Sequence, residues 1–296
     1  MESIIEIVIR IFLCKFDHFW HEWVSALGEV QIKKSLTVPP VNEVEIIYKS
    51  QNFLVINKRH DIVINSDDPS VKISLQIQLK ELFPDLVNPN LQHDFYFVHR
   101  LDYATSGVIC IALHKKACAA ATQAFSERKT KKYYLALLRG HVACERMDMH
   151  KAIGEDSQQR CGNHRMCTLS DPHCVYPRSA HTRLLVLQRG LYDFYPATKV
   201  LLRPITGRRH QLRVHCADIG HTIVGDYTYS NRRDVLPHRM FLHAFRLVLA
   251  NDVEPLCLQT HDPFSSDVTA NKWTPVETLN HIDSASFSKL DMEGDS

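Results

Sequence analysis

Short runs of apolar, β-branched and aromatic residues recur along the chain and predict strands separated by polar turns. The run at 107–113 (GVICIAL) is almost entirely apolar, which is typical of a strand covered on both faces. The run at 131–140 (KKYYLALLRG) is longer and follows a segment of helical pattern. Further strands are expected at residues 45–48, 53–57, 95–98, 182–188, 198–203 and 241–250.

Three helices are expected, the first two from apolar residues at helical spacing. Residues 71–83 form the first, which Pro84 should end, and residues 115–128 form the second. The third follows the turn at Thr206 and ends at Gly220, a residue suited to terminating a helix. Strands outnumber helices and do not alternate with them strictly. The pattern therefore favours an α+β fold with a mixed, largely antiparallel sheet over a doubly wound α/β fold.

Changes in composition divide the chain into three parts. Residues 1–42 form an N-terminal extension whose periodicity predicts a helix packed on the domain, and Glu6 and Arg10 interrupt it too early for a membrane span. Residues 43–262 form the main domain. Residues 263–296 form a polar C-terminal tail, and roughly its last 15 residues are expected to be disordered.

Charge and cysteine content indicate what kind of partner the protein binds and in which compartment it is expected. The net charge is only +2, but basic residues gather at 128–132 and 203–213, and a locally basic face suits a polyanionic partner. Nine scattered cysteines, an odd number, occur without a secretory signal. This combination predicts reduced thiols in the cytoplasm or nucleus, and the acidic N-terminus counts against a mitochondrial presequence.

The segment CGNHRMCTLSDPHC raises a zinc site as an alternative. Its possible ligands are Cys161, His164, Cys167, His173 and Cys174. Their spacing lacks the paired CxxC arms of zinc modules, so we predict no metal here and an irregular insertion over residues 154–180.

The first segment with candidate catalytic residues is HRLDYATSG (99–107), which lies between two predicted strands. Arg100 and Asp102 are two residues apart, so in an extended chain their side chains point the same way. A carboxylate beside a guanidinium stays ionised, which suits a nucleophile or a base. Considered alone, a structural Arg–Asp pair at a turn is the commoner explanation.

A second candidate is RPITGRRHQLRVH (203–215). Thr206 is expected to cap the following helix, on which Arg209 and Arg213, four residues apart, would share a face with His210 beside them. A helix N-terminus rich in arginine and histidine binds phosphate readily. A solvated basic face explains the pattern equally well.

The third candidate is KKYYLALLRGH, in which Tyr134 alternates with Leu135, although a tyrosine packed across strands would be the usual explanation. In this order, the three segments resemble the motifs of the RluA-type pseudouridine synthases. NFLVINK (52–58) resembles the opening strand of that family, and GHTIVGD (220–226) resembles the end of its later motif. The resemblance spans residues 43–262 and implies the pseudouridine synthase fold with a catalytic cleft.

The resemblance implies an enzyme that isomerises uridine in RNA to pseudouridine without cofactor or metal. The N-glycosidic bond breaks, the uracil rotates and a C–C bond forms. By this likeness Asp102 is the catalytic carboxylate, either a nucleophile on the ribose or a base. Arg213 pairs with Asp102, and Tyr134 stacks under the uracil and assists at C5.

The same resemblance assigns an outer set of residues to RNA. Arg100 would fill the gap left by the flipped nucleotide. Arg208, Arg209 and His210 would lie near the RNA backbone. We expect a monomer that binds RNA, whether tRNA, rRNA or mRNA, and no membrane. No basic module of the S4 type is recognisable at the N-terminus.

Two points qualify the resemblance. Where the family often has Lys-Pro-Gly after its opening strand, this chain has Lys58-Arg59-His60-Asp61, so the contacts of that turn are open. A protein that kept the fold for RNA binding and lost turnover is the alternative function. Asp102, Tyr134 and Arg213 are all intact, which argues against that alternative.

Overall fold

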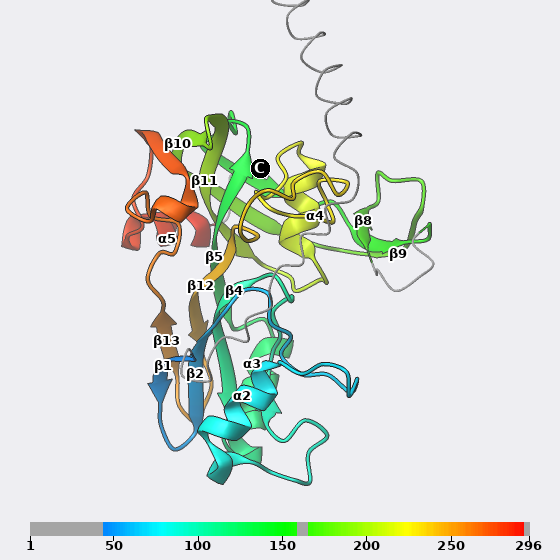
Figure 1. Cartoon of the computed structure of the whole chain (residues 1–296), viewed down its shortest axis with the longest axis vertical. Helices are drawn as coiled ribbons and strands as arrows, with labels where there is room; N and C mark the ends of the chain where they lie inside the picture. Colours follow the sequence, from blue (N-terminus) through cyan, green and yellow to red (C-terminus); the bar gives the residue numbers. More distant parts are fainter. Residues whose placement is uncertain (1–43, 159–164, 293–296) are drawn as a thin grey trace, which may run out of the picture. The chain divides into compact units, whose positions relative to one another are not determined.

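The computed structural model describes residues 44–158 and 165–292. The predicted helical extension at 1–42 lies outside these residues. Within them, the main sheet has the strand order β1-β2-β4-β12-β5-β11-β10-β14, with β3, β6 and β13 on β4, β10 and β12 (Figure 1). Its strands are β1 (Glu45–Lys49), β2 (Phe53–Lys58), β3 (Tyr96–Phe97), β4 (Ser106–Ala112), β5 (Lys131–Arg139), β6 (Arg146–Met149), β10 (Thr182–Tyr192), β11 (Tyr195–Pro204), β12 (Leu242–Leu249), β13 (Leu256–Gln259) and β14 (Trp273–Thr278).

The helices of the described residues cover both faces of this sheet. They are α2 (Leu75–Leu82), α3 (Lys115–Ser126), α4 (Gln211–Asp218) and α5 (Ser284–Asp291), with short 3₁₀ turns at Pro84–Leu86 and Thr269–Asn271. Helices α2 and α3 pack on opposite faces of β2 and β4. Helices α4 and α5 do the same for β5 and β10. Covered on both faces, the central strands need apolar residues at nearly every position, which explains their sequence.

The strands are antiparallel except where β12 meets β4. At that contact Gly107, which closes the candidate segment 99–107, has a φ of 114° and lies against the backbone of Ala244. A Cβ at this position would come within 2.2 Å of the Ala244 carbonyl oxygen, so the segment must end in glycine. The predicted α+β class with a mixed, largely antiparallel sheet is confirmed.

Strand β5 shows the predicted alternation. Tyr133 and Leu135 face the cluster beneath α5, whereas Tyr134 and Ala136 face the cluster beneath α4. The strand therefore sends Tyr134 to the face of the sheet that carries Arg213.

The helix after Thr206 begins later than predicted. Its first residue is Gln211, and its N-cap is His210, which has a left-handed φ of 53°. Thr206 does not cap it, because its hydroxyl donates to Gln211 Oε1 at 2.7 Å. Arg209 precedes the helix, so the expectation that it shares a helical face with Arg213 is wrong.

The insertion at 154–180 is more regular than predicted. It holds a separate three-stranded sheet of β7 (Ile153–Asp156), β8 (Met166–Thr168) and β9 (Cys174–Arg178), in the order β8-β7-β9. These strands have three to five residues each, too few for a periodic pattern to show. Of the possible zinc ligands, Cys161 and His164 lie outside the described residues.

The polar tail predicted from residue 263 is also corrected. Strand β14 pairs with β10, and α5 buries Phe287 and Leu290 in the same cluster as β5. Asp291 accepts hydrogen bonds from Lys131 and Tyr133 and pairs with Arg203. These elements were not predicted because the segment is polar in composition. Only a few buried side chains and ion pairs hold them in place.

Replacing the fully buried Leu290 by alanine should therefore destabilise the whole domain. Removing a leucine side chain from a packed core costs about 2–5 kcal/mol. Urea denaturation should show this loss for Leu290→Ala and almost none for Ser288→Ala, an exposed position on the same helix. Equal midpoints for the two variants would mean that α5 does not belong to the cooperative unit.

Candidate active site

A cavity of about 440 Å³ lies where the 99–107 loop, β5 and the 204–213 segment meet. A cavity of this volume can hold a nucleoside. The three predicted catalytic residues, Asp102, Tyr134 and Arg213, all line it. The four predicted RNA-binding residues, Arg100, Arg208, Arg209 and His210, line it as well.

The loop that carries Asp102 is tethered at two points. At its start, His99 Nε2 accepts the backbone N–H of Cys110 at 2.9 Å. Burial, aided by the charge of Lys132, lowers the pKa of His99 to about 3, so this ring stays neutral and can accept. After Asp102, the Tyr103 carbonyl accepts a hydrogen bond from Lys58 Nζ at 3.1 Å. The carboxylate is thus presented from a fixed backbone, 24% exposed at the pocket wall.

Lys58 was missed as a site residue, although the unusual Lys58-Arg59-His60-Asp61 sequence marked the position. Its ammonium group also donates to the carbonyls of Arg59 and Ile62, both at 2.8 Å. Burial lowers the pKa of Lys58 to about 7, against the opposing charges of Asp61 and Asp102. Three carbonyls around one buried amine hold this turn against the loop that carries Asp102, without the proline and glycine of the family pattern.

Arg213 joins two carboxylates. Its Nη1 lies 3.2 Å from Asp102 Oδ2, while its Nε and Nη2 donate to Asp226 at 2.7 and 2.8 Å. Asp226 has no exposed side-chain surface and also accepts the backbone N–H groups of Thr228 and Tyr229. Burial by itself lowers the pKa of Arg213, but the bonds and charge of Asp226 outweigh it and raise that pKa. Asp226 therefore fixes the guanidinium that orients Asp102, a role that its place in GHTIVGD did not reveal.

Tyr134 lines the same pocket and is partly buried. Burial, together with the negative charge of Asp102, raises the pKa of its phenol. The phenol therefore stays neutral at physiological pH. A neutral ring can lie close to the Asp102 carboxylate without charge repulsion.

His210 lies deeper than a backbone contact would need. Its Nε2 is 3.8 Å from Asp102 Oδ2, and its Nδ1 lies 3.0 Å from the Tyr229 hydroxyl. Burial lowers the pKa of His210 to about 4, although the charge of Asp102 opposes the shift. The structure thus places His210 against the Asp102 carboxylate, as a neutral neighbour, in addition to lining the pocket.

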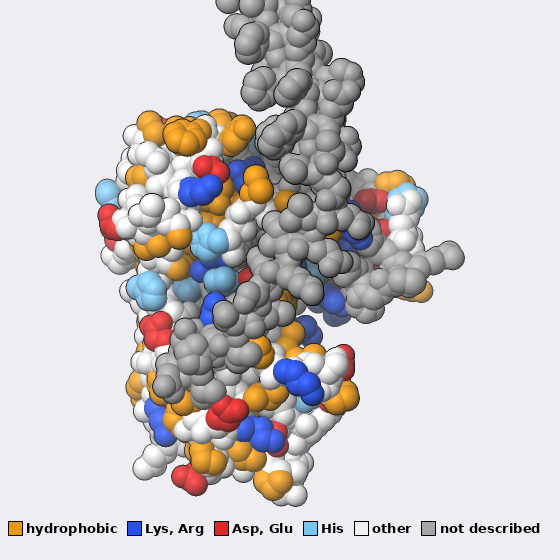
Figure 2. Space-filling model, in the orientation of Figure 1, with side chains coloured by type: hydrophobic (Ala, Val, Ile, Leu, Met, Phe, Trp, Pro, Cys, Tyr) orange, Lys and Arg blue, Asp and Glu red, His pale blue; other side chains and the backbone are white. Residues whose placement is uncertain are grey.

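The pocket mouth is basic. Arg100 and Arg209 are exposed there, and Arg208 is partly exposed, with its Nε donating to the Ser179 carbonyl. Burial, and then the positive charges of Arg178 and Arg128, lower the pKa of Arg208. On the face drawn in Figure 2, by contrast, side chains of both charges are interspersed wherever they are visible. The positive charge is a local feature of the pocket and not of the whole surface.

The buried state of His210 should make stability depend on pH. In the unfolded chain His210 takes up a proton near its ordinary pKa of 6.5, before the folded protein does near 4. Between these values the unfolded state binds more protons, so stability should fall as the pH falls from about 6.5 to about 4. Urea midpoints measured across this range should fall less steeply for His210→Gln than for the unaltered chain. Identical slopes would contradict the burial of this ring.

Comparisons with known proteins agree with this geometry. A family model described as RNA pseudouridylate synthase matches residues 52–218. The chain is 43% identical over 243 residues to RNA pseudouridylate synthase domain-containing protein 1 of Danio rerio, covering 82% of each protein. It is 34% identical over 211 residues to the dual-specificity RNA pseudouridine synthase RluA of Escherichia coli (strain K12), covering 70% of this chain and 86% of that protein.

A solved structure shows the same fold. The structure titled Human RNA Pseudouridylate Synthase Domain Containing 1 matches with a TM-score of 0.75 and 40% identity, over 87% of this chain and 98% of that one. The described helices include none that is long and apolar enough to cross a bilayer. The family resemblance of the three motifs is confirmed, and the chain belongs to the RluA family of RNA pseudouridine synthases.

Proposed function

We propose that this chain is an active synthase that converts uridine to pseudouridine in RNA, with Asp102 as its catalytic carboxylate. The observation that supports this most is the chain of contacts from Asp226 through Arg213 to Asp102, which ends at the wall of a nucleoside-sized pocket. A carboxylate held in this way points in one direction toward a bound nucleoside. Holding a catalytic group in the correct geometry lowers the barrier of the reaction.

The remaining chemistry is compatible with the pocket. Uridine and pseudouridine are isomers, so the reaction consumes no net oxidant, reductant or second substrate. Asp102 would attack the ribose or assist glycal formation, and both routes are open. Tyr134 would lie against the uracil, where an aromatic surface contributes about 1–3 kcal/mol per base. Because its phenol stays neutral, this supporting role suits Tyr134 better than removing the proton from C5.

The basic mouth would bind the RNA backbone. A base inside a helix must leave its stack before a pocket can receive it, which costs a few kcal/mol. Phosphate contacts from Arg208 and Arg209 can offset that cost, and Arg100 would occupy the space that the base leaves. Such binding weakens steeply with salt, so RNA affinity should fall as the ionic strength rises.

A second candidate function is RNA binding without turnover. The same basic mouth would serve it, and the two candidates differ only in whether the glycosidic bond breaks. Tritium release distinguishes them, because forming the new C–C bond at C5 frees the hydrogen there.

The purified chain should be incubated with total RNA from cells that lack this protein, labelled with [5-³H]uridine. We expect release of tritium and new pseudouridine at defined positions. Binding of the RNA without release, over a range of RNA preparations from cytoplasm, nucleus and mitochondria, would favour the binding protein instead.

A further inference from the structure

Outside the pocket, two histidines and an aspartate meet on neighbouring strands. Strands β6 and β10 are antiparallel, and Asp148 pairs with Arg183 while Met149 pairs with Thr182. His150 follows the last residue of β6 and His181 precedes the first residue of β10, so the two lie next to the Met149–Thr182 pair. Residues two apart on a strand point to the same face, so Asp148, His150 and His181 share one face of this strand pair.

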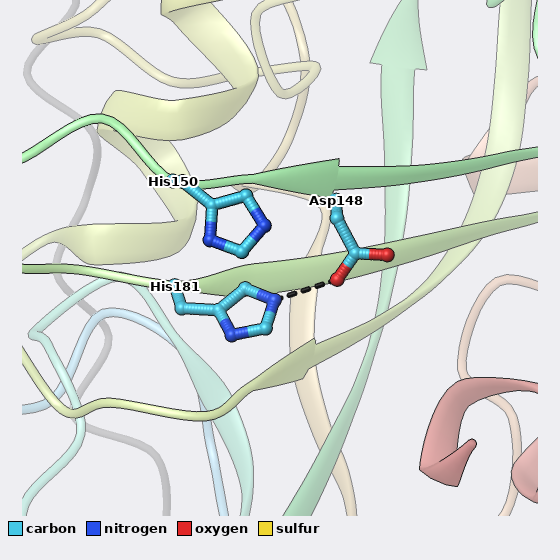
Figure 3. A group of neighbouring side chains, drawn as sticks. All are labelled: Asp148, His150 and His181. Carbon is cyan, nitrogen blue, oxygen red and sulfur yellow. Dashed lines mark hydrogen bonds and ion pairs between the residues drawn. The ribbon is translucent and has the colours of Figure 1, made fainter. Parts of the chain in front are cut away.

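Figure 3 shows the result: the Asp148 carboxylate and the His150 ring both point toward the ring of His181. The Asp148 Oδ1 and His181 Nε2 atoms are 2.6 Å apart, and the two imidazole centroids are 4.1 Å apart. One ligand atom from each residue lies within 4.8 Å of the others. Ligand atoms 2.0–2.2 Å from a tetrahedral ion lie about 3.4 Å from each other. The 2.6 Å contact between Asp148 and His181 would therefore open, and one of the two stacked rings would turn, for the three atoms to face one ion.

Arg183 also holds the Asp148 carboxylate in position. Arg183 Nε donates to Asp148 Oδ1 at 3.1 Å, and its Nη1 is held by the carbonyls of Leu290 and Asp291. The bond goes to Oδ1, and Asp148 Oδ2 lies 3.9 Å from Arg146 Nη2, beyond hydrogen-bond distance. Partners of this kind around a ligating carboxylate are a regular feature of metal sites.

We infer that Asp148, His150 and His181 form a binding site for a divalent transition-metal ion, with Zn²⁺ the best match. Two imidazoles and one carboxylate are the ligands of open three-residue sites, and imidazole suits Zn²⁺ and its neighbours better than Mg²⁺ or Ca²⁺. His150 is exposed, which gives the ion a path from solvent. The site is separate from Asp102 and takes no part in the isomerisation proposed above.

An ion at this site would also brace the active-site segment. The His181 backbone N–H donates to Thr206 Oγ1 at 2.9 Å, and its carbonyl accepts from Ile205 N and Gln211 Nε2, both at 2.9 Å. These three residues line the pocket. A ligand that binds only the folded state stabilises it by mass action, so Zn²⁺ should raise the midpoint of thermal unfolding.

The test is equilibrium binding of Zn²⁺ alone, and of Co²⁺ alone followed by absorption, to the full reduced chain. His150→Ala should remove one bound ion per chain or weaken it by roughly tenfold or more, and should abolish the rise in the unfolding midpoint. His150 is exposed, so this variant should fold, as far-UV circular dichroism would verify. The Co²⁺ spectrum of the lost ion should lack thiolate charge-transfer bands.

His173→Ala is the matched control, because His173 belongs to the separate cysteine- and histidine-rich segment. It should bind the same ion with unchanged affinity. Equal binding by the unaltered chain and His150→Ala would overturn the inference. Loss of the ion in His173→Ala, with thiolate bands in the Co²⁺ spectrum, would overturn it too and assign the metal to that segment.

Discussion

Replacing Asp102 by asparagine should reduce pseudouridine formation by roughly 10⁴-fold or more, the scale on which loss of a central catalytic group acts. The amide keeps the shape of the carboxylate and an oxygen that Arg213 can still bind at the position now 3.2 Å away. It has no negative charge with which to attack the sugar or take a proton. Tritium release from labelled RNA measures the rate, and a filter assay should show RNA affinity almost unchanged.

The matched control for this change is Asp252→Asn, an identical substitution at an exposed position away from the pocket-lining residues. It should leave both the rate and the affinity as they are. A rate for Asp102→Asn within tenfold of the unaltered chain would exclude this carboxylate as the catalytic group, even if the chain proved active.

Replacing Arg213 by leucine should be the most damaging change to stability among the site residues. Asp226 has no exposed side-chain surface, and the substitution removes its ion pair with Arg213, the one recorded for it among the described residues. Breaking a buried ion pair in this way costs about 3–5 kcal/mol. Urea denaturation measures the loss. Adding Asp226→Asn to the variant should recover part of it, because the amide removes the stranded charge while still accepting the N–H groups of Thr228 and Tyr229.

Arg209→Leu provides the control for Arg213. It makes the same substitution within the same sequence motif, but Arg209 is exposed at the pocket mouth. Its effect on stability should stay within about 0.5 kcal/mol, whereas its RNA affinity should fall and depend less on salt. If both variants unfolded at the same urea concentration, Arg213 would not be part of a buried ion pair.

The local parts of the fold could be predicted from the pattern of apolar residues. The alternation in β5 placed Tyr134 and Leu135 on opposite faces, and the apolar run at 107–113 located the buried strand β4. Helix α5 and the sheet at 153–178 escaped prediction. Each depends on a few buried side chains among many polar ones, and averaging over a window of sequence removes such a signal.

The sequence by itself determined which residues could reach the site: Asp102 in a loop that Gly107 closes, and Tyr134 on the correct face of a strand. The family resemblance implied that Arg213 pairs with Asp102, 111 residues away, but residue patterns alone could not bring the two together. Only the tertiary structure shows that Asp226 holds the arginine in place. The reason is physical. Side-chain direction within a strand follows from local geometry, whereas contacts between distant segments depend on strand order, register and the packing of whole elements.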